Sequence, residues 1–355
     1  MIALLICLQS AELLEKHVRY LASPALEGRN NGSEGGRKAA EYVAEKFREA
    51  GLKPGGPQGY FQDFDFRGAP SRNVLGLLEG ESKEVVVVAA HHDGHGVLKG
   101  KVQPGADDNA TGVALVLEVA RELAKTKPKR SILFISFDAE EDGLVGSREF
   151  ARAELYPDVA AAFVFDLVGG RLFEWETDRL YAMGSESSER LSSAVRSTKV
   201  DGLSVLPMGV FLIEPYPDFA RSDYAAFRSK GVPFVFFSTG TPWYYHTEHD
   251  TPEVIDFPKL GRVTAYAKAL ALDTANGPER PAFRKAAPSK EDLAVVRDGL
   301  KMIVKRSEIL TWPPGKYEAA QAALEEISAL TEPEPKAMHK AMMLMLTVAK
   351  AQGKK

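Results

Sequence analysis

Residues 91–112 form a stretch that is dense in side chains able to bind a metal ion. The stretch contains three histidines, three aspartates and five glycines, and few of its residues could fill a core. It follows residues 85–90 (VVVVAA), an apolar run that is short and β-branched enough to be a buried strand. Imidazole and carboxylate groups both suit zinc and related metals. From this stretch alone, a metal site and an acidic surface loop are equally good interpretations.

Two further apolar runs lead to acidic residues in the same way. Residues 132–137 lead to Glu140 and Glu141, and residues 160–165 lead to Asp166. In open α/β sheets, ligands bind at the carboxyl ends of the strands. Three strand ends with ligand-type side chains therefore favour one assembled site over three unrelated acidic loops.

Strand-like and helix-like segments alternate with short connections along most of the chain. The predicted strands are residues 60–66, 72–78, 84–90, 132–137, 160–165, 180–183, 202–206 and 233–237. The predicted helices are residues 11–21, 34–50 (with Ser33 as N-cap), 110–124, 147–155, 187–196, 222–229 and 260–272. This alternation predicts an α/β fold in which a central sheet carries helices on both faces.

The composition changes to proline, lysine and alanine around residues 275–289, which predicts a linker. Three helical segments without a ligand cluster follow it, at residues 290–310, 316–330 and 335–352. We therefore expect one main domain at residues 11–277 and a helical C-terminal extension at residues 278–355.

Residues 1–10 (MIALLICLQS) resemble the apolar part of a secretion signal, but they lack a basic start and a clear cleavage site. We expect an exported protein, periplasmic or secreted, with an atypical signal. The alternative is a cytoplasmic protein whose first residues pack on the domain. No apolar run reaches the roughly 18 to 20 residues that a membrane-spanning helix needs.

The composition also restricts the partners and the metal ligands. The chain of 355 residues has a net charge of −4 and no dense patch of lysine and arginine, which argues against a nucleic-acid partner. Cys7 is the only cysteine, so an intrachain disulfide and a thiolate metal site are both excluded. Any metal ion must be bound by histidine, aspartate or glutamate. The sequence leaves the oligomeric state open.

Five segments resemble, in the same order, the motifs of the co-catalytic two-zinc aminopeptidases (peptidase family M28, bacterial leucyl-aminopeptidase-like). These are residues 91–93 (HHD), 104–112 (PGADDNATG), 140–147 (EEDGLVGS), Asp166 after its strand, and residues 246–251 (HTEHDT). The resemblance covers about residues 11–275. It implies a zinc exopeptidase fold of the phosphorylase/hydrolase-like type, with a mixed central β-sheet sandwiched by helices, and it makes residues 11–277 the catalytic domain.

The resemblance implies two zinc ions per chain. His91 and Asp166 would bind one ion, Glu141 and His246 would bind the other, and Asp108 would bridge them. The bridging role agrees with elementary chemistry, because a carboxylate has two oxygens and can span ions about 3.5 to 4 Å apart.

The resemblance implies that Glu140 is the general base, which binds no zinc ion and lies beside the zinc-activated water. Asp93 lies two residues after His91 and hence on the same side of the strand, where it could hold the second ring nitrogen of His91. The same alternation sends His92 to the opposite face. His92, His95 and His249 are interpreted as residues outside the site.

Three residues are candidates for contact with the substrate. Tyr245 could donate a hydrogen bond to the developing oxyanion. Arg221 and Asp223 match an Arg-Ser-Asp stretch that relatives place near the substrate amine. Tyr224 stands where many relatives have histidine, so this edge of the pocket departs from the family pattern.

The resulting hypothesis is a zinc metallo-aminopeptidase, an exopeptidase that hydrolyses the N-terminal residue of peptide substrates. Two alternatives share the fold: a carboxypeptidase-type enzyme, and a glutaminyl cyclase, which would need one zinc ion where the ligand set here favours two. A non-catalytic binding protein is the third alternative, although Glu140 and the ligands are all retained. A serine hydrolase is excluded because the sequence has no Gly-x-Ser-x-Gly motif.

Overall fold

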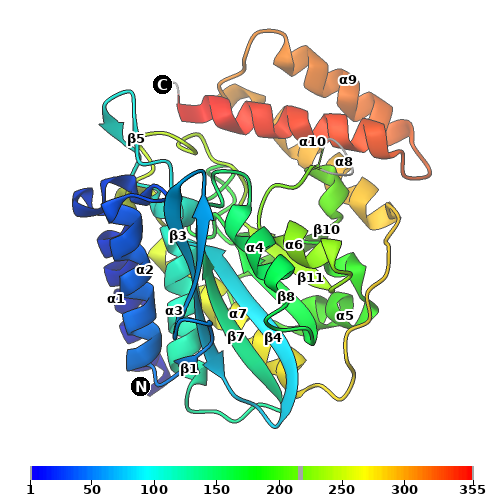
Figure 1. The fold of residues 1–355 in the computed structure, drawn as a ribbon. Coiled ribbons are helices and arrows are strands. Elements are labelled where there is room, and N and C mark those ends of the chain that lie inside the picture. Colours follow the sequence, from blue (N-terminus) through cyan, green and yellow to red (C-terminus); the bar gives the residue numbers. More distant parts are fainter. Residues whose placement is uncertain (1, 215–218, 354–355) are drawn as a thin grey trace.

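Within the described residues, nine strands form one mixed sheet at the centre of the molecule (Figure 1). The computed structural model describes residues 2–214 and 219–353. The strands are β1 (Lys53–Pro54), β2 (Phe61–Phe66), β3 (Ala69–Leu78), β4 (Ser82–His91), β7 (Arg130–Phe137), β8 (Val159–Phe165), β9 (Arg179–Met183), β10 (Ser204–Met208) and β11 (Phe234–Ser238). Their order is β1-β3-β7-β4-β8-β11-β9-β10, with β2 paired to β3. The short strands β5 (Val97–Leu98) and β6 (Lys101–Val102) pair separately in the loop after β4.

The middle of the sheet consists of the parallel strands β7, β4, β8 and β11. Every residue of β7 and β8 is buried. Parallel strands covered on both faces are continuous apolar runs, which is why the sequence predicts them well. Strands β3 and β9 run antiparallel to their neighbours β7 and β11, so the sheet is mixed.

Helices cover both faces of this sheet. They are α1 (Ile2–Leu21), α2 (Glu34–Glu49), α3 (Thr111–Leu123), α4 (Val145–Ala153), α5 (Glu189–Ser197), α6 (Tyr224–Ser229) and α7 (Phe257–Asn276). One buried apolar cluster joins a face of the sheet to α1, α2, α3, α5 and α7, and a second cluster joins the other face to α4 and α6. The predicted α/β fold, with a mixed central sheet between helices, is confirmed.

The C-terminal part of the chain forms α8 (Lys290–Lys305), α9 (Lys316–Ala329) and α10 (Pro335–Lys350), coloured orange to red in Figure 1. Buried residues of all three helices belong to the same apolar cluster as α4 and α6. Asp292 holds the start of α8: its Oδ2 atom accepts the backbone N–H of Ser289 at 2.8 Å, which completes a capping box. Its Oδ1 atom accepts the N–H of Gly209, just after β10, at 2.6 Å.

Element boundaries follow the sequence closely, with small differences. Ser33 caps α2 as expected, since its Oγ atom accepts the N–H of Gly36 at 3.0 Å. β10 begins two residues later than predicted because Gly202, with φ +74°, lies in the preceding turn. The signal-like segment at residues 1–10 falls at the start of α1, and Met1 lies outside the described residues. In the described part of the chain, no helix has both the length and the apolar content needed to cross a bilayer.

Candidate metal centre

The candidate ligands gather at one edge of the sheet, where four parallel strands end side by side. β4 ends in His91, and the other three strands lead into turns or loops that carry ligand-type residues. The residues that follow β7, β8 and β11 are Glu140 and Glu141, Asp166, and His246, respectively. Asp108 comes from η2 (Ala106–Ala110), directly before α3. The strand order therefore brings together residues that are far apart in the sequence.

Asp108 lies between two groups of ligand atoms. Its Oδ1 atom is 3.4 Å from His91 Nε2, which in turn is 3.5 Å from Asp166 Oδ1. Its Oδ2 atom is 3.1 Å from His246 Nε2, which is 3.5 Å from Glu141 Oε2. One carboxylate thus offers a separate oxygen to each group, an arrangement that suits a pair of neighbouring metal ions.

Several atoms of this cluster fit a metal because they have no other partner. Within the described chain, the Nε2 atom of His91 and the Oδ1 atom of Asp166 are buried without a hydrogen bond. Buried polar atoms are otherwise nearly always paired, because leaving them unpaired costs free energy. A cation coordinated by Nε2 of His91 and Oδ1 of Asp166 would satisfy both groups.

The electrostatics of the cluster also favours cations. Burial raises the pKa of Glu140 and of Glu141 well above their usual values, and the charges of Asp166 and Asp108, respectively, add to the effect. Burial works against the His91 imidazolium, but the neighbouring Glu140 and Asp166 outweigh it and raise the pKa of His91 well above its usual value. Carboxylates crowded into a buried site in this way are stabilised by divalent ions.

Asp93 contacts both sides of the centre. Its Oδ1 atom lies 3.3 Å from His91 Nδ1, and its two carboxylate oxygens accept the backbone N–H groups of Glu140 and Glu141, each at 3.1 Å. His92 faces away from the cluster, with Nδ1 at 3.0 Å from Ser136 Oγ on β7. Alternation along β4 thus separates the two adjacent imidazoles.

Two further residues support the acidic ligands, and the sequence analysis does not identify either. Asp250 accepts the backbone N–H groups of Asp107 and Asp108 at 2.7 and 3.0 Å. Ser222, which is fully buried, donates its hydroxyl to Asp166 Oδ2 at 2.9 Å. The signal for Asp250 is its place within the segment HTEHDT, whereas Ser222 stands between Arg221 and Asp223, the two predicted substrate contacts.

His95 also lies at the centre, although the sequence analysis interprets it as a residue outside the site. Its Nε2 atom is 3.3 Å from Glu141 Oε2, and its ring meets the His246 ring edge-on with centroids 4.1 Å apart. His95, Glu141 and His246 therefore form a second group whose ligand atoms could share one ion. The only sequence signal is its position, four residues after His91 in the same loop.

Arg29 connects the loops that carry the ligands. It is fully buried, and its guanidinium donates to four backbone carbonyls within 2.6 to 2.9 Å. The acceptors are His92, Leu21, Pro104 and Gly105. Because these carbonyls flank His91 on one side and precede Asp108 on the other, Arg29 fixes the two loops relative to each other.

The three residues predicted to contact substrate occupy different environments. Tyr245 stacks on His246, with ring centroids 3.6 Å apart, and lines a cavity that Asp166 also lines. Arg221 lines the same cavity and donates to the carbonyl of Ile213 at 3.0 Å. Asp223 is fully buried and is not among the residues that line the cavity.

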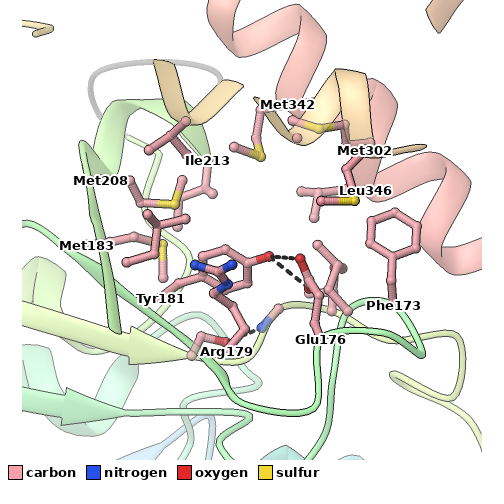
Figure 2. Close-up of a pocket in the computed structure, with 18 of the residues that line it drawn as sticks. Phe173, Glu176, Arg179, Tyr181, Met183, Met208, Ile213, Met302, Met342 and Leu346 are labelled. Atoms are coloured by element: carbon pink, nitrogen blue, oxygen red, sulfur yellow. Dashed lines mark hydrogen bonds between the residues drawn. The ribbon is translucent and has the colours of Figure 1, made fainter. Parts of the chain in front are cut away.

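This cavity has a volume of about 630 Å³ and extends from the metal centre toward the C-terminal helices. Figure 2 shows Met183, Met208 and Ile213 on one side of it, and Met302 and Met342 on the other. At its floor the Tyr181 hydroxyl contacts both carboxylate oxygens of Glu176, at 3.0 and 2.9 Å. The metal centre thus opens onto a largely apolar space.

Comparison with solved structures identifies the same fold. A zinc aminopeptidase from Bacillus subtilis superposes with a TM-score of 0.60 at 18% identity, covering 77% of this chain and 98% of that one. A glutaminyl cyclase from Porphyromonas gingivalis superposes with a TM-score of 0.59 at 18% identity, covering 73% and 96% of the two chains. At these identities the likeness establishes the fold and leaves the reaction open.

Comparison of sequences identifies the family. Aminopeptidase YwaD of Bacillus subtilis (strain 168) is 27% identical over 240 residues, which are 61% of this chain and 47% of YwaD. The chain thus aligns with about half the length of that relative. The family model described as Peptidase family M28 matches residues 73–271, which include every candidate metal ligand named above. The protein is therefore a hydrolase that belongs to peptidase family M28.

Proposed function

We propose that this protein is an aminopeptidase, which releases the N-terminal residue of a peptide with the help of two zinc ions. The observation that carries the proposal is the position of Asp108, with one oxygen 3.4 Å from His91 Nε2 and the other 3.1 Å from His246 Nε2. His91 and Asp166 would bind the first ion. Glu141 and His246, with His95 beside them, would bind the second. Asp108 would contact both.

When bound, zinc acts as a Lewis acid that polarises the peptide carbonyl and lowers the pKa of an attacking water molecule. Glu140 is free for proton transfer, because its Oε2 atom lies 4.0 Å from His91 Nε2 and it belongs to neither group of ligand atoms. Its carboxylate accepts a proton from the water and delivers it to the leaving amine. Tyr245, on the cavity side of His246, donates its hydroxyl to the oxygen on which negative charge develops.

The excess of acidic groups supports a substrate with a free amine. Two zinc ions would offset the charges of Glu141, Asp108 and Asp166. The acidic groups left over are Glu140 and Asp223, and a carboxylate that no cation neutralises favours an ammonium group beside it. Asp223 lies close enough to Glu140 for its charge to contribute to the raised pKa of Glu140. Arg221 lies in the cavity wall, where it can contact a polar part of the substrate.

A panel of aminoacyl-p-nitroanilides, each with an N-acetylated control, tests the proposal. We expect hydrolysis of the free-amine substrates only, loss of activity with a chelator, and recovery with zinc. Equal hydrolysis of the acetylated compounds would reject an aminopeptidase. Cyclisation of glutaminyl peptides without anilide hydrolysis would instead identify a glutaminyl cyclase, the alternative that shares this fold.

Replacement of the base separates chemistry from metal binding. We expect Glu140→Gln to keep two zinc ions per chain and to lose roughly 100- to 10,000-fold in kcat, the usual contribution of a general base. Asp142→Asn, an exposed neighbour in the same turn, is the matched control and should leave kcat unchanged. Full activity of Glu140→Gln would reject the assigned role.

A further inference from the structure

The cavity beside the metal centre has walls from two parts of the chain. One wall comes from β9, β10 and the loops around them, including Met183 and Met208. The opposite wall comes from α8 and α10, including Met302 and Met342, and Figure 2 shows the two sets of side chains facing each other. The matched family segment ends at residue 271, so the second wall lies outside it.

The lining is apolar and adaptable. Five of the eight methionines in the sequence line this cavity among the described residues. They are Met183, Met208, Met302, Met342 and Met345. Methionine is unbranched and flexible, and it fits its surface to apolar groups of different shapes. A wall of this kind favours a flexible apolar chain over a group of one fixed shape.

Several polar side chains of the lining are already paired with one another. The Tyr181 hydroxyl bonds to Glu176, and Arg196 forms an ion pair with Glu291 at the side of α8. The Arg306 guanidinium lies over the Trp175 ring, 5.0 Å from its centroid. Because these groups have partners, the surface left in the interior is mostly apolar, although charged residues such as Arg179 and Arg221 line the cavity too.

The volume and the position of the cavity define what can enter it. About 630 Å³ is within the range of pockets that enclose whole drug-sized ligands. It therefore has room for a side chain longer than leucine. Asp166 and Tyr245 line the cavity as well. A substrate side chain bound in the cavity therefore belongs to a residue whose peptide bond lies near the metal centre.

We propose that α8 and α10 complete the substrate pocket and that the pocket takes an N-terminal residue with a long, flexible apolar side chain. The inference rests on the proposed function, because it assigns the cavity to the residue that the metal centre releases. The residues of α8 that line the pocket then limit the length of the substrate side chain that the pocket can accept.

Substrates of graded length test this inference. Alanyl-, norleucyl- and 2-aminooctanoyl-p-nitroanilide differ only in their straight side chains. Each buried methylene is worth about fourfold in an equilibrium constant. We expect kcat/KM to rise about 15-fold from norleucyl to 2-aminooctanoyl, whose side chain is two methylenes longer. Normal hydrolysis of the alanyl substrate without any gain for the longer ones would overturn the inference and leave the proposed function intact.

Variants of α8 test the wall directly. Ala294 is half-buried and lines the cavity, so Ala294→Phe should reduce the ratio of kcat/KM for 2-aminooctanoyl to that for norleucyl to about twofold or less. Met302→Trp should act in the same way, and its side chain, 39% exposed, can be replaced without disturbing the core. Lys301→Phe introduces the same ring on the same helix outside the cavity and should behave as the wild type. If both cavity variants kept the wild-type ratio of kcat/KM for 2-aminooctanoyl to that for norleucyl, the inference would be overturned.

A binding measurement separates this inference from the proposed function. If no anilide of any length is hydrolysed, the proposed function fails, and calorimetry with 2-aminooctanoic acid decides the inference. We expect the zinc-loaded wild type to bind this amino acid at least tenfold more tightly than Ala294→Phe does. Equal affinities would overturn the assigned pocket wall.

Discussion

Asp93 Oδ1 lies 3.3 Å from His91 Nδ1, on the side of the ring opposite to the candidate ligand atom. The same oxygen accepts the Glu140 N–H, and its partner oxygen accepts that of Glu141. A single buried carboxylate therefore orients one imidazole ligand and the backbone of both glutamates. Groups of this kind fix the ring orientation and the basicity of a metal-bound histidine.

We expect Asp93→Asn to weaken zinc binding about 10- to 100-fold, as is usual when the partner of a ligand histidine is removed. The amide can accept only through one atom, so it loses at least one of the two backbone contacts. Competition with a chromogenic chelator measures the affinity. Asp65→Asn, at an exposed position in β2, is the control. Equal zinc affinity of wild type and Asp93→Asn would contradict the assigned role.

His95→Ala should weaken the binding of one zinc ion about tenfold and leave the other unchanged, because His95 contacts Glu141 and His246 but lies outside the group formed by His91, Asp108 and Asp166. Calorimetric titration of metal-stripped protein resolves the two ions. The matched control is His249→Ala, an exposed histidine of the loop that carries His246. Two unchanged binding steps in His95→Ala would show that this ring takes no part.

Arg29→Met should lower the free energy of unfolding by roughly 3 to 5 kcal/mol, because several acceptors lose their donor and each unsatisfied buried acceptor costs about 1 to 3 kcal/mol. The variant leaves three buried carbonyls and one partly buried carbonyl without this donor. Urea unfolding of the zinc-loaded protein measures the change. Arg152→Met, at an exposed arginine, should fall within about 0.5 kcal/mol of the wild type. A similarly small effect of Arg29→Met would refute the connecting role.

Glu186 should make stability depend on pH. Burial raises the pKa of Glu186 to about 7, although its Oε1 atom accepts the Val210 N–H at 3.0 Å. The unfolded chain loses this proton near pH 4.3, so between these two values the folded state holds more protons than the unfolded state. The contribution of protonated Glu186 to the free energy of unfolding is therefore complete below the pKa of the unfolded chain. It declines as the pH rises to about 7.

Glu186→Gln removes this proton uptake but keeps a carbonyl that can accept the Val210 N–H. We expect the variant to gain on the order of 2 kcal/mol relative to the wild type between pH 5 and pH 8. Urea unfolding at several pH values, with zinc held constant, measures the difference. Glu81→Gln, at an exposed glutamate, is the control, and its free energy of unfolding should depend on pH as that of the wild type does. If the free energy of unfolding of Glu186→Gln changed with pH in the same way as that of the wild type, the prediction would be refuted.

The sequence predicts the parallel centre of the sheet because residues 132–135 of β7 and all residues of β8 form continuous apolar runs. It also predicts that their ends meet, since parallel strands place their carboxyl ends at one edge. His95, Ser222 and Asp250 escape the prediction for a different reason. Each reaches the centre from a loop or turn, and its contact depends on tertiary packing that no periodicity records.

The position of the cavity also depends on tertiary packing and cannot be predicted from the sequence. Helical spacing in residues 290–310 shows which face of the helix is apolar, but it does not show that this face turns toward β10 and the metal centre. That relationship arises from the way the C-terminal helices share a buried cluster with α4 and α6.

The two carboxylate oxygens of Asp292 serve different parts of the molecule, one closing the first turn of α8 and the other holding Gly209. The first turn of α8 and its attachment to the end of β10 therefore depend on one buried side chain. A movement of α8 away from this edge of the sheet would break the hydrogen bond from Gly209, so Asp292 helps to maintain the spacing between the methionine-bearing walls.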